Sequence, residues 1–194
     1  MTKKSKLYTL VECAILIAIA TVLSIIKIYE APLGGSVTLF SMVPIILISF
    51  RHGIKWGLGS GFVYSVLQLM LGMKNVMYVP GIVGIILCIL LDYILAFTVL
   101  GLAGIFKTDK IFKIIFATLF LCVLRYICHV LSGAVVWYEI TKQGGWNDLV
   151  MRTGMWVYSL IYNIQYMLPE TIITLVAAPA IVTILSVVNK QKIR

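Results

Sequence analysis

Charged side chains are scarce in this chain. Only 12% of its 194 residues are charged, whereas 61% are hydrophobic and the mean hydropathy is +1.06. A soluble domain is nearer half apolar and a quarter charged. A water-soluble fold could not cover so much apolar surface, so the composition excludes a soluble enzyme, a nucleic-acid-binding domain and a disordered chain. It predicts a polytopic membrane protein that forms one domain over residues 1–194.

Motifs for enzymatic chemistry are also missing. The chain has no GxxxxGK[ST] for ATP hydrolysis, no HExxH, no GxSxG and no paired acidic motif. Its four cysteines lie in apolar stretches without a CxxC pair, and it has two histidines. A disulfide framework or a zinc site is therefore not expected. The sequence predicts a protein that is not an enzyme and that uses no cofactor and no metal.

Six apolar stretches predict an all-α integral membrane protein, a compact bundle of six transmembrane helices. Their approximate ranges are 7–28, 37–50, 53–73, 79–106, 111–138 and 166–188. The last apolar stretch is longer than one span, which needs about 20 residues. Residues 154–165 are therefore expected to be a loop or interfacial structure, with Pro169 in the first turn of the sixth helix.

The basic residues predict the orientation. If both chain ends are cytoplasmic, most of the 16 Lys and Arg residues lie in the inner segments, and Arg125 is left inside the membrane. Cytoplasmic loops of membrane proteins carry an excess of Lys and Arg, so the N-in, C-in arrangement is favoured. The same bias accounts for the net charge of +9 without a nucleic-acid partner.

Ionisable residues occur inside the predicted spans. Each costs about 2.5–3.5 kcal/mol near a helix centre, so each is a candidate for function. Asp92 lies in the middle of the fourth span beside Tyr93, and Arg125 and His129 are four residues apart, on one face of the fifth. One interpretation is a structural ion pair between Arg125 and either Asp92 or Glu170. The other is a site for a polar ligand.

Aromatic residues accompany these groups in the outer half of the bundle. An aromatic belt at the membrane surface is the simplest interpretation of residues such as Trp137 and Tyr158. Together with a carboxylate, and with Asn163 and the Gly-containing outer loop 29–38 nearby, they also suit a small, partly aromatic ligand. The negative ring faces further favour a cation.

Small residues recur at four-residue spacing on two predicted helices. They are Ala14 and Ala18 on the first helix, and Gly53, Gly57 and Gly61 on the third. Such faces let helices approach closely, either inside the bundle or against another membrane protein. Internal packing is favoured for the glycines, and both interpretations stay open for the alanines.

Three segments carry a resemblance to a known family. They are LDYILAFTVLGLAGIF (Leu91–Phe106), RYICHVLSGAVVW (Arg125–Trp137) and YSLIYNIQYMLPE (Tyr158–Glu170). They resemble the thiamine-specific substrate-binding subunit of energy-coupling factor (ECF) vitamin transporters, in order and spacing over essentially the whole chain. The resemblance implies a six-helix protein of the bacterial plasma membrane with high affinity for thiamine at its outer face. It also implies two kinds of partner: a scaffold subunit in the membrane and two ABC-type ATPases in the cytoplasm.

The resemblance also implies roles for individual residues. Ligand contact maps to Asp92, Tyr93, Arg125, His129, Trp137, Tyr158 and Asn163. The small-xxx-small motif of Ala14 and Ala18 is similar to the surface that docks on the scaffold. Some family members cover the ligand with a Trp in the first outer loop, where this chain has Pro-Leu-Gly-Gly. The candidate lid residues are therefore Tyr29, Leu33, Gly34 and Gly35.

Other functions remain open from the sequence alone. The nearest alternative is a subunit for another vitamin, such as riboflavin, or for a thiamine precursor. An autonomous channel or carrier would need no ATPases. A membrane enzyme acting on lipid or prenyl substrates is disfavoured, because it would show paired acidic motifs at a cytoplasmic helix end.

Overall fold

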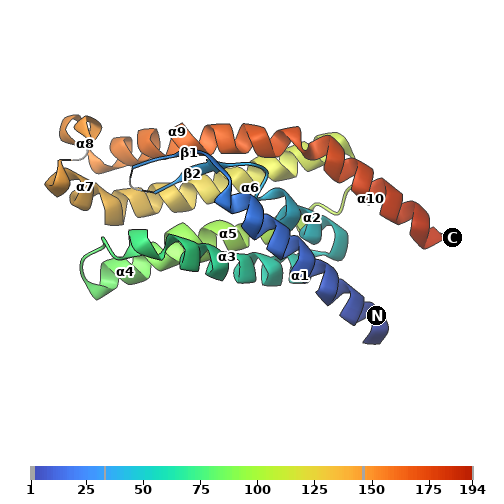
Figure 1. Ribbon diagram of the computed structural model, residues 1–194. Coiled ribbons are helices and arrows are strands. Elements are labelled where there is room, and N and C mark those ends of the chain that lie inside the picture. Colours follow the sequence, from blue (N-terminus) through green and yellow to red (C-terminus); the bar gives the residue numbers. More distant parts are fainter. Residues whose placement is uncertain (1–2, 33, 146, 194) are drawn as a thin grey trace.

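The computed structural model describes residues 3–32, 34–145 and 147–193, with side chains placed for 6–32, 34–145 and 147–187. Helices make up nearly all of it, arranged as an elongated bundle (Figure 1). The helices are α1 (Lys3–Ile25), α2 (Val43–His52), α3 (Ile54–Val76), α4 (Ile82–Cys88), α5 (Ala96–Thr98), α6 (Ile111–Ser132), α7 (Tyr138–Gly144), α8 (Asp148–Arg152), α9 (Met155–Val176) and α10 (Ala178–Ile193). Three further helical segments continue their neighbours: the π-helices η1 (Ile89–Leu95) and η3 (Gly133–Trp137), and the 3₁₀-helix η2 (Val99–Ile105).

Within the described residues, four helical runs are long and apolar enough to cross a membrane. They are Lys6–Ile25, Ile82–Ile105, Ile111–Gly144 and Met155–Val187. Large apolar side chains stay exposed along them, such as Phe112 at 83%, as expected of surfaces that face lipid. The helical membrane class is therefore confirmed with four candidate spans. The α3 helix is of similar length but carries several glycines and Gln68 in its middle, and it is not among the four.

The six-helix count and the orientation stay predictions. α1 begins and α10 ends at the same end of the bundle (Figure 1), as an even number of spans requires. The distribution of the basic residues predicts that both ends face the cytoplasm.

The last apolar stretch differs from its prediction. Residues 155–165 are helical and belong to α9, so Pro169 lies inside that helix rather than in its first turn. The stretch is longer than one span because it holds two helices, α9 and α10, with a break at Ala177. A proline within a membrane helix is tolerated where neighbouring groups satisfy the freed backbone groups.

The first outer loop also differs from its prediction. An antiparallel hairpin of β1 (Lys27–Glu30) and β2 (Ser36–Thr38) connects the first two helices. It replaces the end of the helix expected over 7–28 and the start of the helix expected over 37–50. Gly34 and Gly35 turn the chain with φ of 94° and 86°, values that side chains other than glycine rarely adopt. Helix α2 starts only at Val43 and has Pro44 in its first turn, where the missing N–H has no helical partner to lose.

Glycines bring α3 and the fourth helical run into backbone contact. A Cβ atom at Gly101 would overlap backbone atoms of Gly57 and Leu58, and a Cβ at Gly61 would press on the backbone of Thr98. Internal packing therefore explains Gly57 and Gly61. It does not explain Gly53, because a Cβ atom there would meet nothing within 4 Å; instead, its φ of 86° ends α2.

This close contact predicts a large effect of one methyl group. We expect Gly101→Ala to lower the midpoint of thermal unfolding in detergent by about 2–12 °C, since overpacking against backbone costs roughly 1–3 kcal/mol. Gly59→Ala is the matched control, because a Cβ at Gly59 meets no atom within 4 Å. The control should be neutral or stabilising, and equal midpoints for the two variants would contradict the close packing.

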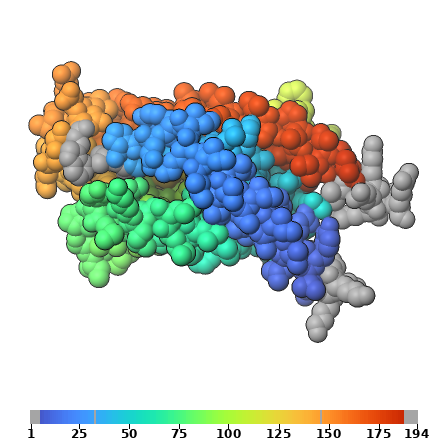
Figure 2. Space-filling model, in the orientation of Figure 1, coloured from blue at the N-terminus to red at the C-terminus, as the bar shows by residue number. Residues whose placement is uncertain are grey.

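Helix α1 lies across the face of the molecule that Figure 2 shows, and its residues alternate between buried and exposed positions along the helix. Cys13, Ile17 and Ala20 belong to the core, whereas Ala14 and Ala18 are exposed. The structure therefore argues against internal packing of these alanines, and docking against another membrane protein stays a prediction.

Candidate functional site

A cavity of about 560 Å³ lies between the hairpin and the helices α1, α3, α6 and α9. The seven residues predicted to contact a ligand all line it: Asp92, Tyr93, Arg125, His129, Trp137, Tyr158 and Asn163. They come from three separate helical runs, so the fold brings together residues that are up to 71 positions apart. The volume falls within the usual range for small-molecule sites, roughly 300–1,000 Å³.

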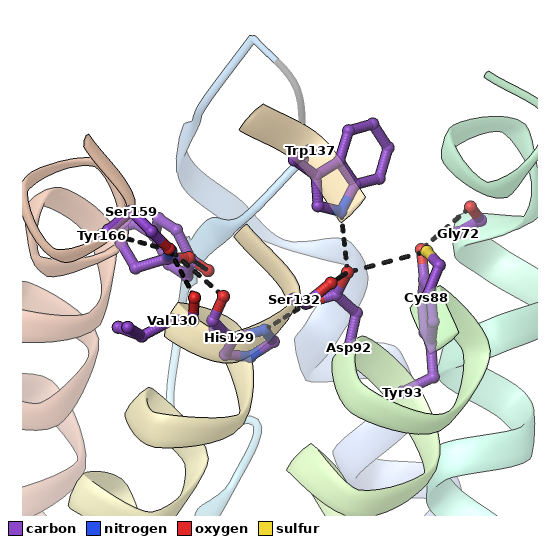
Figure 3. A network of polar contacts seen from close by, with 12 residues as sticks. Gly72, Cys88, Asp92, Tyr93, His129, Val130, Ser132, Trp137, Ser159 and Tyr166 are labelled. Atoms are coloured by element: carbon purple, nitrogen blue, oxygen red, sulfur yellow. Dashed lines mark hydrogen bonds and ion pairs between the residues drawn. The ribbon is translucent and has the colours of Figure 1, made fainter. Parts of the chain in front are cut away.

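The carboxylate of Asp92 is the centre of a hydrogen-bond network (Figure 3). Oδ2 accepts from Ser132 Oγ at 2.6 Å and from Trp137 Nε1 at 2.8 Å, and Oδ1 lies 3.0 Å from His129 Nδ1. The thiol of Cys88 lies 3.6 Å from Oδ2. The partly buried charge is thus held by donors on α6 and η3, and no contact between Asp92 and Arg125 is among them.

Two π-helical turns place the main partners of this network. Asp92 lies in η1 and Trp137 is the last residue of η3. A π-turn holds one more residue than an α-turn, so it rotates the side chains that follow it, and such turns are frequent at functional sites. Here the two turns aim the indole N–H of Trp137 at the Asp92 carboxylate.

His129 has one ring nitrogen engaged and one free. A carboxylate can only accept, so Nδ1 donates to Asp92, and Nε2 of the neutral ring is left as an acceptor. Nε2 is buried and has no hydrogen-bond partner among the described residues. Buried polar atoms are nearly always paired in native proteins, so an unpaired one on a cavity wall favours a ligand contact.

Arg125 carries a positive charge deep in the helical wall of the cavity, in addition to Lys27 of the hairpin. Its guanidinium lies 4.4 Å from the ring centroid of Phe97, and Nη1 lies 2.8 Å from the sulfur of Met42 and 4.0 Å from Oε1 of Glu170. Of the two ion pairs considered from the sequence, Glu170 with Arg125 is present. The Nε atom of Arg125 is buried and unpaired in the described structure.

Asn163 and Tyr158 line the cavity with their polar atoms already engaged. The Asn163 amide donates to the Ser159 carbonyl at 2.8 Å and accepts from the Tyr166 hydroxyl at 2.5 Å. The Tyr158 hydroxyl lies 3.2 Å from Thr141 Oγ1, and its ring stacks on Tyr162 at 5.7 Å. In this structure both residues support the wall, and a direct polar contact with a ligand would require them to exchange partners.

Only some of the predicted lid residues that the structure describes line the cavity. Gly34 and Gly35 line the cavity, and the Tyr162 hydroxyl donates to the Gly34 carbonyl at 3.1 Å. Tyr29 lies in β1, is 45% exposed and does not line the cavity. Leu33 lies outside the described residues.

Sequence reasoning missed several lining residues. The side of the cavity formed by α1 and α3 is polar: Gln68 Nε2 donates to Ser24 Oγ at 2.8 Å, and Asn75 lies close by on the same wall. Neutral polar side chains in a span cost less than charged ones, so they did not stand out. The polar Gln68 in the middle of apolar α3 is the one signal that could have identified this wall.

Comparison with known proteins agrees with this geometry. A family model described as "Thiamine transporter protein (Thia_YuaJ)" matches residues 10–192. The chain is 35% identical to "Thiamine transporter ThiT" of Bacillus subtilis (strain 168) over 187 residues, which cover 89% of each chain. It is 26% identical to the protein of the same name in Lacticaseibacillus paracasei (strain ATCC 334) over 197 residues, covering 95% of this chain and 91% of that one.

A solved structure is similar over almost the same length. The structure of ThiT from Listeria monocytogenes superposes with a TM-score of 0.68 at 25% sequence identity. The superposition covers 96% of this chain and 97% of that chain.

Proposed function

The chain belongs to the Thia_YuaJ family of thiamine transporter proteins, and from this premise we propose that it is the thiamine-binding subunit of an ECF-type importer in the bacterial cell membrane. It captures thiamine at the outer face for ATP-driven uptake. The observation that carries the proposal is the cavity in which the partly buried Asp92 carboxylate, an unpaired histidine nitrogen and several aromatic rings meet.

The chemistry of thiamine suits this cavity. Its thiazolium ring is permanently positive, and its aminopyrimidine ring is neutral with donors and acceptors. The Asp92 carboxylate favours the cation, and the Trp137 ring, fixed by its bond to Asp92, offers a face for stacking. The unpaired His129 Nε2 can accept a hydrogen bond from the amino group of the pyrimidine.

Arg125 has a different role in this proposal. Its charge is balanced by Glu170, so it does not oppose the thiazolium directly. Its unpaired Nε can donate to a polar group of the ligand. A fixed donor of this kind selects among ligands, because an analogue without the matching acceptor leaves the donor buried and unpaired.

Energy for uptake has to come from other subunits. The sequence has no P-loop for ATP hydrolysis. We propose that two cytoplasmic ABC-type ATPases supply it through a membrane scaffold subunit, and that the exposed alanines of α1 contact this scaffold. An autonomous carrier is the alternative, and it would transport thiamine without the ATPases.

A fluorescence titration tests the proposed ligand. Because Trp137 lines the cavity, thiamine should quench the intrinsic fluorescence at nanomolar to low-micromolar concentration. Riboflavin and biotin should neither quench nor compete. The chain has four Trp residues, so Trp137→Phe is the control that should remove most of the quench. Tight binding of riboflavin without binding of thiamine would overturn the proposal.

A further inference from the structure

Three side chains of α9 hold the hairpin in place. The Tyr162 hydroxyl donates to the Gly34 carbonyl at 3.1 Å, and the Tyr166 ring lies so close to Gly35 that a Cβ there would overlap it. Glu170 accepts from the Thr38 backbone N–H at 2.5 Å and from the Thr38 hydroxyl at 2.7 Å. We call Tyr162, Tyr166 and Glu170 the hairpin seat.

The spacing of the hairpin seat matches the course of the hairpin. The three residues are four positions apart, so they lie on one face of α9. Successive residues of the seat contact successive residues of the hairpin, from the turn at Gly34 to the end of β2 at Thr38. The hairpin accordingly runs alongside α9 (Figure 1).

Glu170 is the residue of the seat that would be most costly to lose. It is only 2% exposed, and a buried carboxylate persists only when donors and a counter-ion surround it. The hairpin supplies the donors and the cavity wall supplies the counter-ion. Thr38 supplies the two donors from the hairpin, and Arg125 supplies the positive charge from the cavity wall at 4.0 Å.

Glu170 does not line the cavity itself. We propose that Glu170 is a positioning residue for ligand retention: it fixes β2 through Thr38, and it couples the hairpin to the cavity through Arg125. A ligand that engages Arg125 then stabilises the same carboxylate that holds the hairpin closed. This inference rests on the proposed binding of thiamine, although the hairpin seat itself does not require the ligand.

The test measures the hairpin and the ligand separately. In the ligand-free protein, Glu170→Ala should raise the amide hydrogen exchange of residues 36–38 by about tenfold or more, because Thr38 loses its acceptor. With thiamine bound, the same variant should speed dissociation by about tenfold while the association rate changes less, since weaker closure acts on release. Dissociation is followed by Trp fluorescence after displacement.

Two further variants separate positioning from folding. Glu170→Gln keeps the size and an amide oxygen for the Thr38 N–H, so hairpin protection should return to within about threefold of wild type. Thr38→Val removes the hydroxyl, and with it the bonds to Glu170 Oε1 and to Ser41 Oγ. It leaves Glu170 and Arg125 in place, so it tests the link even if Glu170→Ala does not fold. The matched control is Thr171→Val, whose hydroxyl donates to the Met167 carbonyl within α9.

The outcomes distinguish the inference from the proposed function. Faster hairpin exchange and faster thiamine release in Thr38→Val, with Thr171→Val unchanged, support the positioning role. Unchanged exchange and release in Thr38→Val and in a folded Glu170→Ala would overturn it. Absence of thiamine binding by the wild-type protein would instead overturn the proposed function, and the exchange of the ligand-free hairpin would still decide whether the seat exists.

Discussion

Asp92→Asn is expected to weaken thiamine binding by at least about tenfold, or roughly 1.4 kcal/mol. The substitution is nearly isosteric but removes the negative charge that the ligand cation would meet. It also replaces one acceptor oxygen by an NH₂ group in a site where Ser132, Trp137 and His129 all bond the carboxylate. The measurement is a thiamine titration by Trp fluorescence or calorimetry.

The control for this prediction is Asp148→Asn. Asp148 is exposed in the first turn of α8 and does not line the cavity, so the same loss of charge there should leave the affinity unchanged. A thermal unfolding scan of Asp92→Asn completes the experiment. Unchanged affinity together with a large loss of stability would show that the carboxylate only holds η1 to η3.

The predicted site residues were accessible to sequence reasoning because the membrane makes charged residues conspicuous. Asp92, Arg125 and His129 stood out among apolar neighbours, since each carries a cost that needs a reason. Family resemblance then added the aromatic and amide residues. The structure brings all seven around one cavity, and their contact with a ligand stays a prediction.

Backbone irregularity explains much of what the sequence did not reveal. No residue pattern in the sequence predicts the two π-turns that orient Asp92 and Trp137 toward each other. The hairpin was missed because Gly34 and Gly35 indicate a turn equally well in a flexible loop and between two short strands. Of the two ion pairs considered for Arg125, the one with Asp92 is absent, because the local helix geometry brings Asp92 to His129 instead.

Long-range pairing explains the remaining differences. Glu170 and Thr38 are 132 positions apart, and neither is unusual at the end of an apolar segment. Their contact depends on how α9 runs along the hairpin, which requires residues 155–165 to be helical. The sequence predicts a loop over 154–165, and a loop there does not place Tyr162, Tyr166 and Glu170 on one helix face as α9 does.

The double variant Ala14→Trp with Ala18→Trp is expected to abolish ATP-driven thiamine uptake and leave binding intact. Both alanines are exposed on α1, and neither lines the cavity. If the scaffold subunit docks on this face, two indole rings hold its helices away, because small residues are needed where helix backbones approach closely. Thiamine affinity should stay within about threefold, or 0.65 kcal/mol.

Transport and assembly are measured in cells and by co-purification with the scaffold subunit. Val123→Trp with Ile127→Trp is the matched control, because these residues are also four apart and each is 46% exposed, but on α6. That control should bind, assemble and transport normally. If lipid contact alone mattered, the two pairs would behave alike, since both place tryptophans on surfaces of membrane-spanning helices. Full uptake by the α1 variant would remove the docking role, whereas loss of uptake confined to α1 would separate capture of thiamine from its ATP-driven transport.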